Sequence, residues 1–279
     1  MSAAPSPGSH LMARISSVWL FATALCLFTQ GCATRAARVD EAAREFGFRK
    51  LHLSGSGFVH AAYFKPTGGG TVLHVYIEHD GTPWRHPTTP SADPTPEDPL
   101  ALAMMSQDPA PSLYLGRPCY FGAAAQPPCE PVWWTHRRFS REVVDSMAAA
   151  LGQFLRAHPD FDTLHLFGYS GGGVLATLLS AEFSLTRRLV TVAAPLDLDG
   201  WTRLHGYSPM TGSLDPARQP PLPATVHQLH FSGADDRVVP GNLIKPFVEM
   251  QPVAEYVEIP GFDHRCCWAK SWRTLILGP

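Results

Sequence analysis

Residues 163–181 read TLHLFGYSGGGVLATLLSA. The first five residues form a short apolar run typical of a buried strand, and the small and apolar residues that follow Ser170 favour a helix. Between the two lies Gly168-Tyr169-Ser170-Gly171-Gly172, a G-x-S-x-G sequence. A sharp strand-to-helix turn of this kind exposes the serine hydroxyl, and it needs glycines because a Cβ two residues away would collide with the neighbouring elements. Ser170 is therefore a candidate nucleophile.

The remainder of the chain from Phe48 alternates β-rich and helical runs, the pattern of an α/β fold. Strands are expected at 48–55, 57–65, 71–79, 112–116, 163–169, 189–195, 225–233 and 256–261. Helices are expected at 141–158 with Ser140 as N-cap, at 172–183, and near 242–249 and 267–276. The first two strands are close enough in sequence to pair as an antiparallel hairpin. We predict a central, mostly parallel sheet of about eight strands with helices on both faces.

Two insertions interrupt this alternation. Residues 83–111 are rich in Pro, Asp and Thr, which predicts an irregular surface segment with at most one short helix. Residues 196–223 follow the sixth strand and are rich in Gly, Pro and Ser, which predicts a short flap able to cover a site. Four tryptophans lie in loops expected near the catalytic end of the sheet, where they either pack as loop anchors or line a cleft: Trp84, Trp133, Trp134 and Trp201.

Length and composition favour a single folded domain. The chain has 279 residues, of which 45% are hydrophobic, and residues 48–279 suit one α/β domain. Only 16% of residues are charged and the formal net charge is -2, so no basic face is available for nucleic acid. No histidine pair has the spacing of a zinc site, and we expect neither a metal nor a cofactor.

The N-terminal residues 1–33 have the pattern of an export signal. The run 15–29 (ISSVWLFATALCLFT) is apolar, follows Arg14, and is shorter than the ~20 residues that span a bilayer. Gly31-Cys32-Ala33 resembles a lipobox, so Cys32 is a candidate lipidation site that would anchor the protein to the periplasmic side of a membrane. Cleavage after Ala33 with simple secretion, and an uncleaved anchor, are the alternatives. Residues 34–47 would form a tether or a short helix.

Export would place the remaining cysteines in an oxidising compartment. Cys119 and Cys129 flank a Gly- and Pro-rich loop, and a disulfide between them would close it; two free buried thiols are the alternative. Cys266 and Cys267 are adjacent, and a bridge between neighbours is strained, so we expect them to be unpaired.

Two further motifs follow the G-x-S-x-G sequence. FSGADDRVVP (231–240) and IPGFDHRCCW (259–268) stand downstream of it in the order nucleophile, acid, histidine, and on these motifs the chain resembles the α/β-hydrolase superfamily. The resemblance implies that Asp236 is the acid and His264 the base of a catalytic triad with Ser170. Asp235 is an alternative acid. Asp197 or Asp199 is another, since some members place the acid after the sixth strand.

The resemblance also implies an oxyanion hole. One donor would be the amide of Gly171, the residue that follows the nucleophile. The other would come from EHDGTPW (78–84), which resembles the family's H-G-x turn and points to the amide of Thr82, with Gly81 next to it. Asp80 departs from the family pattern, because a histidine is common there.

The expected activity is hydrolysis of a small-molecule carboxylic ester through an acyl-enzyme, without a cofactor. A peptidase or thioesterase would use the same triad. A protein of this fold that binds an envelope ligand without turnover is the alternative from a different class, and the acidic residue at position 80 is its only support in the sequence.

Overall fold

The computed structural model describes residues 1–4, 34–66 and 69–277. The chain divides into two units, Met1–Thr34 and Arg35–Pro279, and the second unit carries the fold. Residues 15–29, the lipobox and Cys32 lie outside the described residues, so the predicted export signal and lipidation site stay predictions. Within the described residues, no helix combines the length and the hydrophobicity needed to cross a membrane.

Eight strands form the main sheet of the second unit, in the spatial order β1-β2-β6-β3-β7-β8-β9-β10. They are β1 (Arg49–Ser54), β2 (Val59–Lys65), β3 (Val72–Ile77), β6 (Ser112–Leu115), β7 (Thr163–Tyr169), β8 (Thr186–Val192), β9 (His227–Gly233) and β10 (Ala254–Ile259). β2 pairs antiparallel with β1 and with β6, and every other neighbouring pair is parallel. The predicted mostly parallel sheet and its opening hairpin are confirmed.

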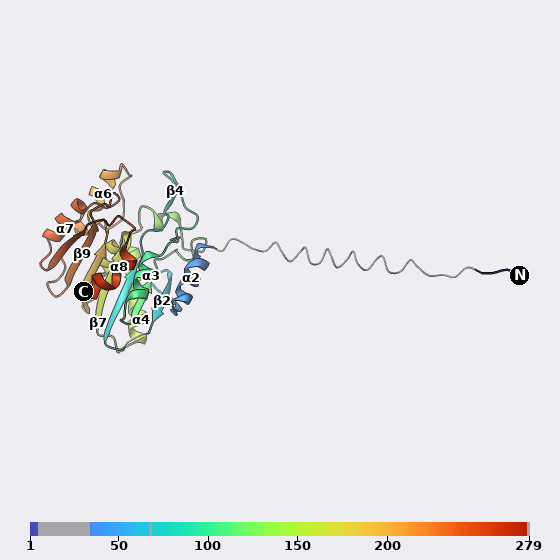
Figure 1. Ribbon diagram of the computed structural model, residues 1–279. Helices are drawn as coiled ribbons and strands as arrows, with labels where there is room; N and C mark the ends of the chain where they lie inside the picture. The colour runs from blue at the N-terminus through green and yellow to red at the C-terminus, as the bar shows by residue number, and fades with distance from the viewer. Residues whose placement is uncertain (5–33, 67–68, 278–279) are drawn as a thin grey trace. The chain divides into compact units, whose positions relative to one another are not determined.

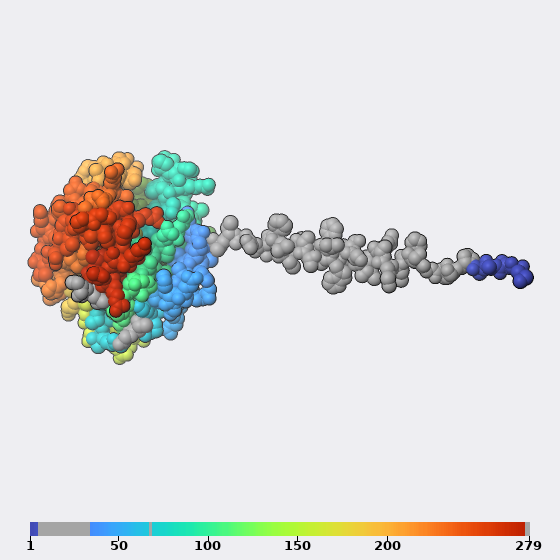
Figure 2. All heavy atoms as spheres, in the orientation of Figure 1, coloured from blue at the N-terminus to red at the C-terminus, as the bar shows by residue number. Residues whose placement is uncertain are grey.

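Helices cover both faces of this sheet because successive strand residues point to opposite sides. On β7, Leu164 and Leu166 pack into one apolar core, and Phe167 and Tyr169 pack into another. The first core includes α4 (Arg141–Ala157) and α5 (Gly171–Ser180). The second includes α2 (Arg35–Glu45), α3 (Leu100–Gln107) and α8 (Trp268–Leu277), which lie on the face seen in Figure 1. In Figure 2 the blue, green and red segments of these three helices lie on one surface although they are far apart in sequence.

The helix boundaries follow local chemistry. The Ser140 hydroxyl accepts a hydrogen bond from the amide of Val143 at 3.4 Å, so the predicted N-cap of α4 is confirmed. Pro159 follows the helix by two residues, as expected for a residue that cannot continue it. The last predicted helices are η3 (Gly241–Leu243) with α7 (Lys245–Glu249), and α8.

Two segments are more deeply packed than the sequence indicated. Within 83–111, only β4 (Trp84–His86) and β5 (Thr89–Pro90) form a surface hairpin. The helix α3 lies in the core with Leu102 and Met105 fully buried, because its run LALAMM is apolar. The Pro-rich flanks dominate the composition of the segment, so composition alone did not indicate this burial. Of the two alternatives predicted for residues 34–47, a tether or a short helix, the structure shows the helix. Because α2 buries Val39 and Ala43, the folded domain begins at Arg35 rather than Phe48.

The segment 196–223 follows β8, the sixth strand of the main sheet, as predicted. It forms α6 (Leu198–His205) and the short helix η2 (Pro216–Arg218). Asp197 caps α6 by accepting a hydrogen bond from the amide of Gly200 at 2.7 Å. Trp201 of α6 donates its indole N–H to the carbonyl of Val238 at 3.0 Å, so the segment packs against the loop that follows β9.

Candidate functional site

The candidate site lies at the carboxyl ends of the parallel strands, which meet along one edge of the sheet. Ser170 directly follows β7 and is the N-cap residue of α5. Its backbone has φ +52° and ψ −125°, a conformation rare for residues with a side chain, and its amide is held by the carbonyl of Val192 at 2.8 Å. A Cβ on Gly172 would lie 2.1 Å from the carbonyl oxygen of Ile77, so the close approach of α5 to β3 requires glycine there. The sharp turn is therefore built as predicted.

The structure brings together the three side chains of the predicted triad. The Nε2 atom of His264 lies 3.1 Å from the Ser170 hydroxyl oxygen, and its Nδ1 atom lies 2.9 Å from Oδ2 of Asp236. Asp236 is buried, and its other oxygen accepts hydrogen bonds from the amides of Val238 and Val239, each at 2.8 Å. An imidazole placed between a carboxylate and a hydroxyl can take the hydroxyl proton, because the carboxylate orients the ring and stabilises its charged form.

The alternative acids lie elsewhere. Asp235 is exposed, and its amide bonds to the carbonyl of Phe262. Asp197 caps α6, and Asp199 forms an ion pair with Arg218. Of these four aspartates, only Asp236 has a hydrogen bond to the His264 ring.

A cavity of about 360 Å³ opens beside Ser170 and His264. Its walls come from the turn 79–82, from residues 97, 98 and 100, and from Tyr169 and Arg265. Leu100 is the single aliphatic side chain among these lining residues, and the carboxylate of Asp98 pairs with Arg265 at 2.5 Å. None of the four tryptophans singled out in the sequence lines this cavity, and no residue of the 196–223 segment does so. The segment predicted to be a flap therefore contributes no residue to the lining of this cavity.

In the turn after β3, two amides predicted as oxyanion donors already have acceptors in the structure. The amide of Thr82 donates to the carbonyl of Pro94 at 3.0 Å, and the amide of Gly81 donates to Nδ1 of His79 at 2.9 Å. Both amides therefore already have acceptors, as does that of His79, which donates to Oε1 of Glu78 at 3.2 Å. The amide of Asp80 is left as the candidate donor of this turn. Gly171 begins α5, and the first amides of a helix have no partner within it.

Two titratable groups with shifted pKa values support this turn, the partly buried His79 and the buried Glu78. Burial lowers the pKa of His79 to about 4, so the ring is neutral, with Nε2–H directed to the carbonyl of Asp98 at 3.3 Å and Nδ1 free to accept from Gly81. Burial raises the pKa of Glu78 to about 8, against hydrogen bonds from the amides of His79, Ala101 and Leu102. The side chain of Glu78 thereby joins the start of α3 to the end of β3.

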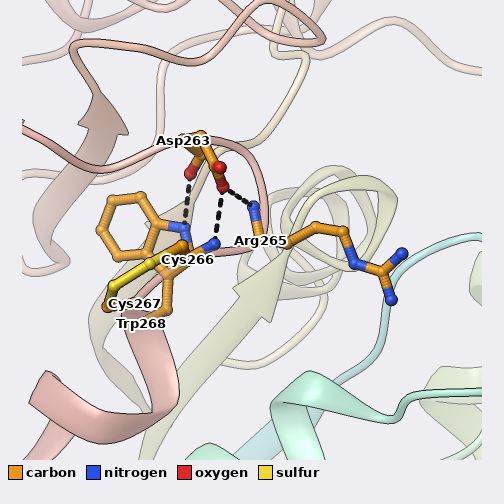
Figure 3. The surroundings of a disulfide bond; sticks show 5 residues. All are labelled: Asp263, Arg265, Cys266, Cys267 and Trp268. Carbon is orange, nitrogen blue, oxygen red and sulfur yellow. Dashed lines mark hydrogen bonds between the residues drawn. A yellow bond between two sulfur atoms is a disulfide. The ribbon is translucent and has the colours of Figure 1, made fainter.

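The cysteines give one confirmation and one correction. Cys119 and Cys129 form the predicted disulfide, with Cα atoms 5.4 Å apart. Cys266 and Cys267 are also joined by a disulfide, so the prediction that they are unpaired is wrong. They lie two and three residues after His264, in a turn organised by Asp263 (Figure 3). One carboxylate oxygen of Asp263 accepts from the amides of Arg265 and Cys266, and its carbonyl accepts from the indole N–H of Trp268 at 3.1 Å.

No family model and no curated relative matches the sequence, whereas its fold resembles many solved structures. A serine hydrolase homologue from Coxiella burnetii is 14% identical, with a TM-score of 0.54 over 82% of this chain and 93% of that one. A membrane phospholipase A described as a bacterial virulence factor is 16% identical, with a TM-score of 0.57 over 94% and 97%. Est1E from Butyrivibrio proteoclasticus, bound to ferulic acid, is 14% identical, with a TM-score of 0.57 over 81% and 98%. At these identities the likeness is one of fold.

Proposed function

We propose that this chain, which has the α/β-hydrolase fold, is a serine hydrolase that cleaves a carboxylic ester through an acyl-enzyme. The observation that carries the proposal is the continuous hydrogen-bonded chain from Asp236 through His264 to the hydroxyl of Ser170, at 2.9 Å and 3.1 Å. Serine hydrolases and an α/β hydrolase among the structural neighbours support the same reaction class.

The reaction proceeds in two halves. Ser170 Oγ attacks the ester carbonyl carbon while its proton passes to Nε2 of His264, and the carbonyl oxygen becomes an oxyanion. Collapse of this tetrahedral intermediate breaks the bond to the alcohol, which leaves with the proton from His264. Water then attacks the acyl-enzyme, gives a proton to His264, and releases the carboxylic acid as Ser170 recovers its proton. Asp236 keeps Nδ1 protonated throughout and stabilises the imidazolium that forms in each half.

Two backbone amides would hold the oxyanion. We assign them to Gly171 at the start of α5 and to Asp80 on the turn after β3. The amides of Gly81 and Thr82 already have acceptors, Nδ1 of His79 and the carbonyl of Pro94. Each donor of this kind is worth roughly 3 kcal/mol to the transition state. Gly171 also lies where the helix N-terminus favours negative charge.

The lining of the cavity favours a small substrate part near the nucleophile. About 360 Å³ is at the lower end of ordinary ligand pockets, and Leu100 is the single aliphatic side chain among its lining residues. We infer an ester with a short acyl group rather than a long-chain lipid. The Cys119–Cys129 disulfide supports an exported protein, since such bonds persist in oxidising compartments.

The experiment is active-site labelling with a fluorophosphonate, combined with hydrolysis of p-nitrophenyl acetate and p-nitrophenyl palmitate. Wild-type protein should be labelled and should prefer the acetate, and Ser170→Ala should lose both label and activity. Asp236→Asn should lower kcat by about 10³- to 10⁴-fold through the wrong tautomer of His264. The matched control is Asp235→Asn, which changes the exposed neighbour and should retain activity within about twofold.

Each outcome discriminates between the candidate functions. Folded wild-type protein that takes no label would favour the binding protein over an enzyme. Labelled protein that cleaves a peptide amide or a thioester much faster than the acetate would transfer the assignment to a peptidase or a thioesterase with the same triad.

A further inference from the structure

Asp80 is held by two buried arginines. Nη1 of Arg117 lies 2.7 Å from one carboxylate oxygen of Asp80, and Nε of Arg138 lies 2.9 Å from the other. The two arginine side chains are only 3% and 7% exposed. The Tyr120 hydroxyl donates to the backbone carbonyl of Asp80 at 2.9 Å. The residue that departs from the family pattern is thus fixed through both its side chain and its backbone.

This cluster of Asp80, Arg117 and Arg138 lies directly against the nucleophile turn. A Cβ on Gly171 would be 1.9 Å from Oδ1 of Asp80 and 2.9 Å from Nη2 of Arg117. The carboxylate and the guanidinium therefore touch the backbone whose amide is one of the proposed oxyanion donors. A side chain at position 171 would force this backbone and the cluster apart.

The charges in the cluster do not cancel. Two guanidinium groups, which stay protonated in proteins, face one carboxylate. Burial alone would raise the pKa of Asp80, but the charges of Arg138 and Arg117 outweigh it and hold the pKa below its usual value. Glu78, the other acid near Arg117, has a pKa raised by burial to about 8 and is mostly neutral at pH 7. The cluster carries one excess positive charge.

Stability alone does not account for such a cluster. Burying several charges costs desolvation energy that their attraction seldom repays, and apolar residues of similar volume often give equal or higher stability. The guanidinium groups are also fixed in place, since both lie 5.3 Å from the Phe139 ring centroid. Rigid charge close to the point where an anion develops is the arrangement that lowers a barrier for acyl transfer.

We infer that Arg117 and Arg138 are positioning residues of the ester-cleaving site. Through Asp80 they fix the turn that presents the second oxyanion donor, and their excess positive charge stabilises the tetrahedral intermediate. The inference rests on the proposed function, and it names residues that do not themselves touch the substrate.

The test measures how tightly each variant binds phenylboronic acid, which adds to a serine hydroxyl as a tetrahedral anion, alongside KM and kcat for p-nitrophenyl acetate. Arg117→Gln and Arg138→Gln should each weaken boronate binding and lower kcat by about 10- to 100-fold, with KM changed less than about threefold. The matched control is Arg137→Gln. Arg137 adjoins Arg138 in sequence but pairs with Glu142 at the surface, so its variant should stay within about twofold of wild type.

A charge-balance variant separates electrostatics from structural support. Arg138→Gln removes the excess positive charge of the cluster, and adding Asp80→Asn restores it. The double variant also breaks the remaining ion pair, between Asp80 and Arg117. We expect this double variant to bind the boronate at least fivefold more tightly than Arg138→Gln alone. If Arg138→Gln does not fold, the double variant is compared with wild type. We then expect its affinity for the boronate to lie within about tenfold of the wild-type affinity.

Two results would overturn the inference. One is folded Arg117→Gln and Arg138→Gln proteins with wild-type boronate affinity and kcat. The other is a folded double variant that binds the boronate no better than Arg138→Gln, or more than about tenfold worse than wild type when the single variant does not fold. Both differ from failure of the proposed function, in which Ser170→Ala would keep its fluorophosphonate label or its esterase activity.

Discussion

Replacing Gly172 with alanine tests the geometry that places the nucleophile. The added Cβ would lie 2.1 Å from the carbonyl oxygen of Ile77 and 2.6 Å from that of Glu78. Both are backbone atoms of the segment at the end of β3, so neither can rotate away as a side chain could. Relief of the contact requires α5 and β3 to separate by about 1 Å, since carbon and oxygen atoms that are not bonded stay more than about 3 Å apart.

The expected magnitude follows from that displacement. Overpacking of a tight contact typically costs about 1–3 kcal/mol of unfolding free energy. For a domain of this size the loss corresponds to a decrease in Tm of roughly 2–12 °C. The shift also moves the turn that carries Asp80 away from Ser170, and a misplacement of about 1 Å can cost about 100-fold in rate. We therefore expect activity to fall further than the change in stability alone would explain.

The assay is thermal unfolding by circular dichroism together with kcat/KM for p-nitrophenyl acetate. The matched control is Gly152→Ala in α4, where the nearest atom to an added Cβ is Nη1 of the Arg156 side chain at 3.3 Å. That variant should raise Tm by about 1–4 °C, because alanine is the better helix former, and leave activity unchanged. A Gly172→Ala protein with the Tm and activity of wild type would refute the argument that backbone contact imposes glycine.

Two further predictions concern stability. Replacing Cys119 and Cys129 by serine should lower the free energy of unfolding by roughly 3 kcal/mol in urea, because their sequence separation is 10; a loss below about 1 kcal/mol would count against the loop-closure account. Burial lowers the pKa of four histidines to about 3 or 4, namely His60, His79, His165 and His230. Since the unfolded chain binds these protons near pH 6.5 and the folded chain does not, stability should fall as pH drops from about 6.5 to 4. Glu78 opposes the trend because its pKa is raised to about 8, which leaves about three protons net and a slope on the order of 4 kcal/mol per pH unit. A urea midpoint that is independent of pH between 7 and 5 would contradict it.

Several features followed from sequence because neighbours along the chain decide them. The apolar runs and the short connection predicted the β1–β2 hairpin, and Ser140 with the helical spacing after it predicted α4 and its cap. The turn at Ser170 could be read because strand, glycines and helix are contiguous. The resemblance to a known family added Asp236 and His264, which local patterns alone would not have paired.

Other features depend on residues that folding brings together from distant positions. β6 inserts between β2 and β3, and α3 packs against α8, although composition assigned that segment to the surface. The amides of Gly81 and Thr82 are engaged by acceptors that a motif does not specify. Arg117 follows a buried strand, which was a signal that it needed a counter-ion, but nothing in the sequence connected it to Asp80.

The sequence by itself determined the order of the main-sheet strands along the chain, the sharp turn and the candidate nucleophile on it, since each depends on backbone preferences over a few residues. Tertiary structure alone decided which amides of the turn after β3 already have acceptors and which charges surround Asp80. These depend on burial and on distances of about 3 Å between segments far apart in the chain, and no local pattern encodes them.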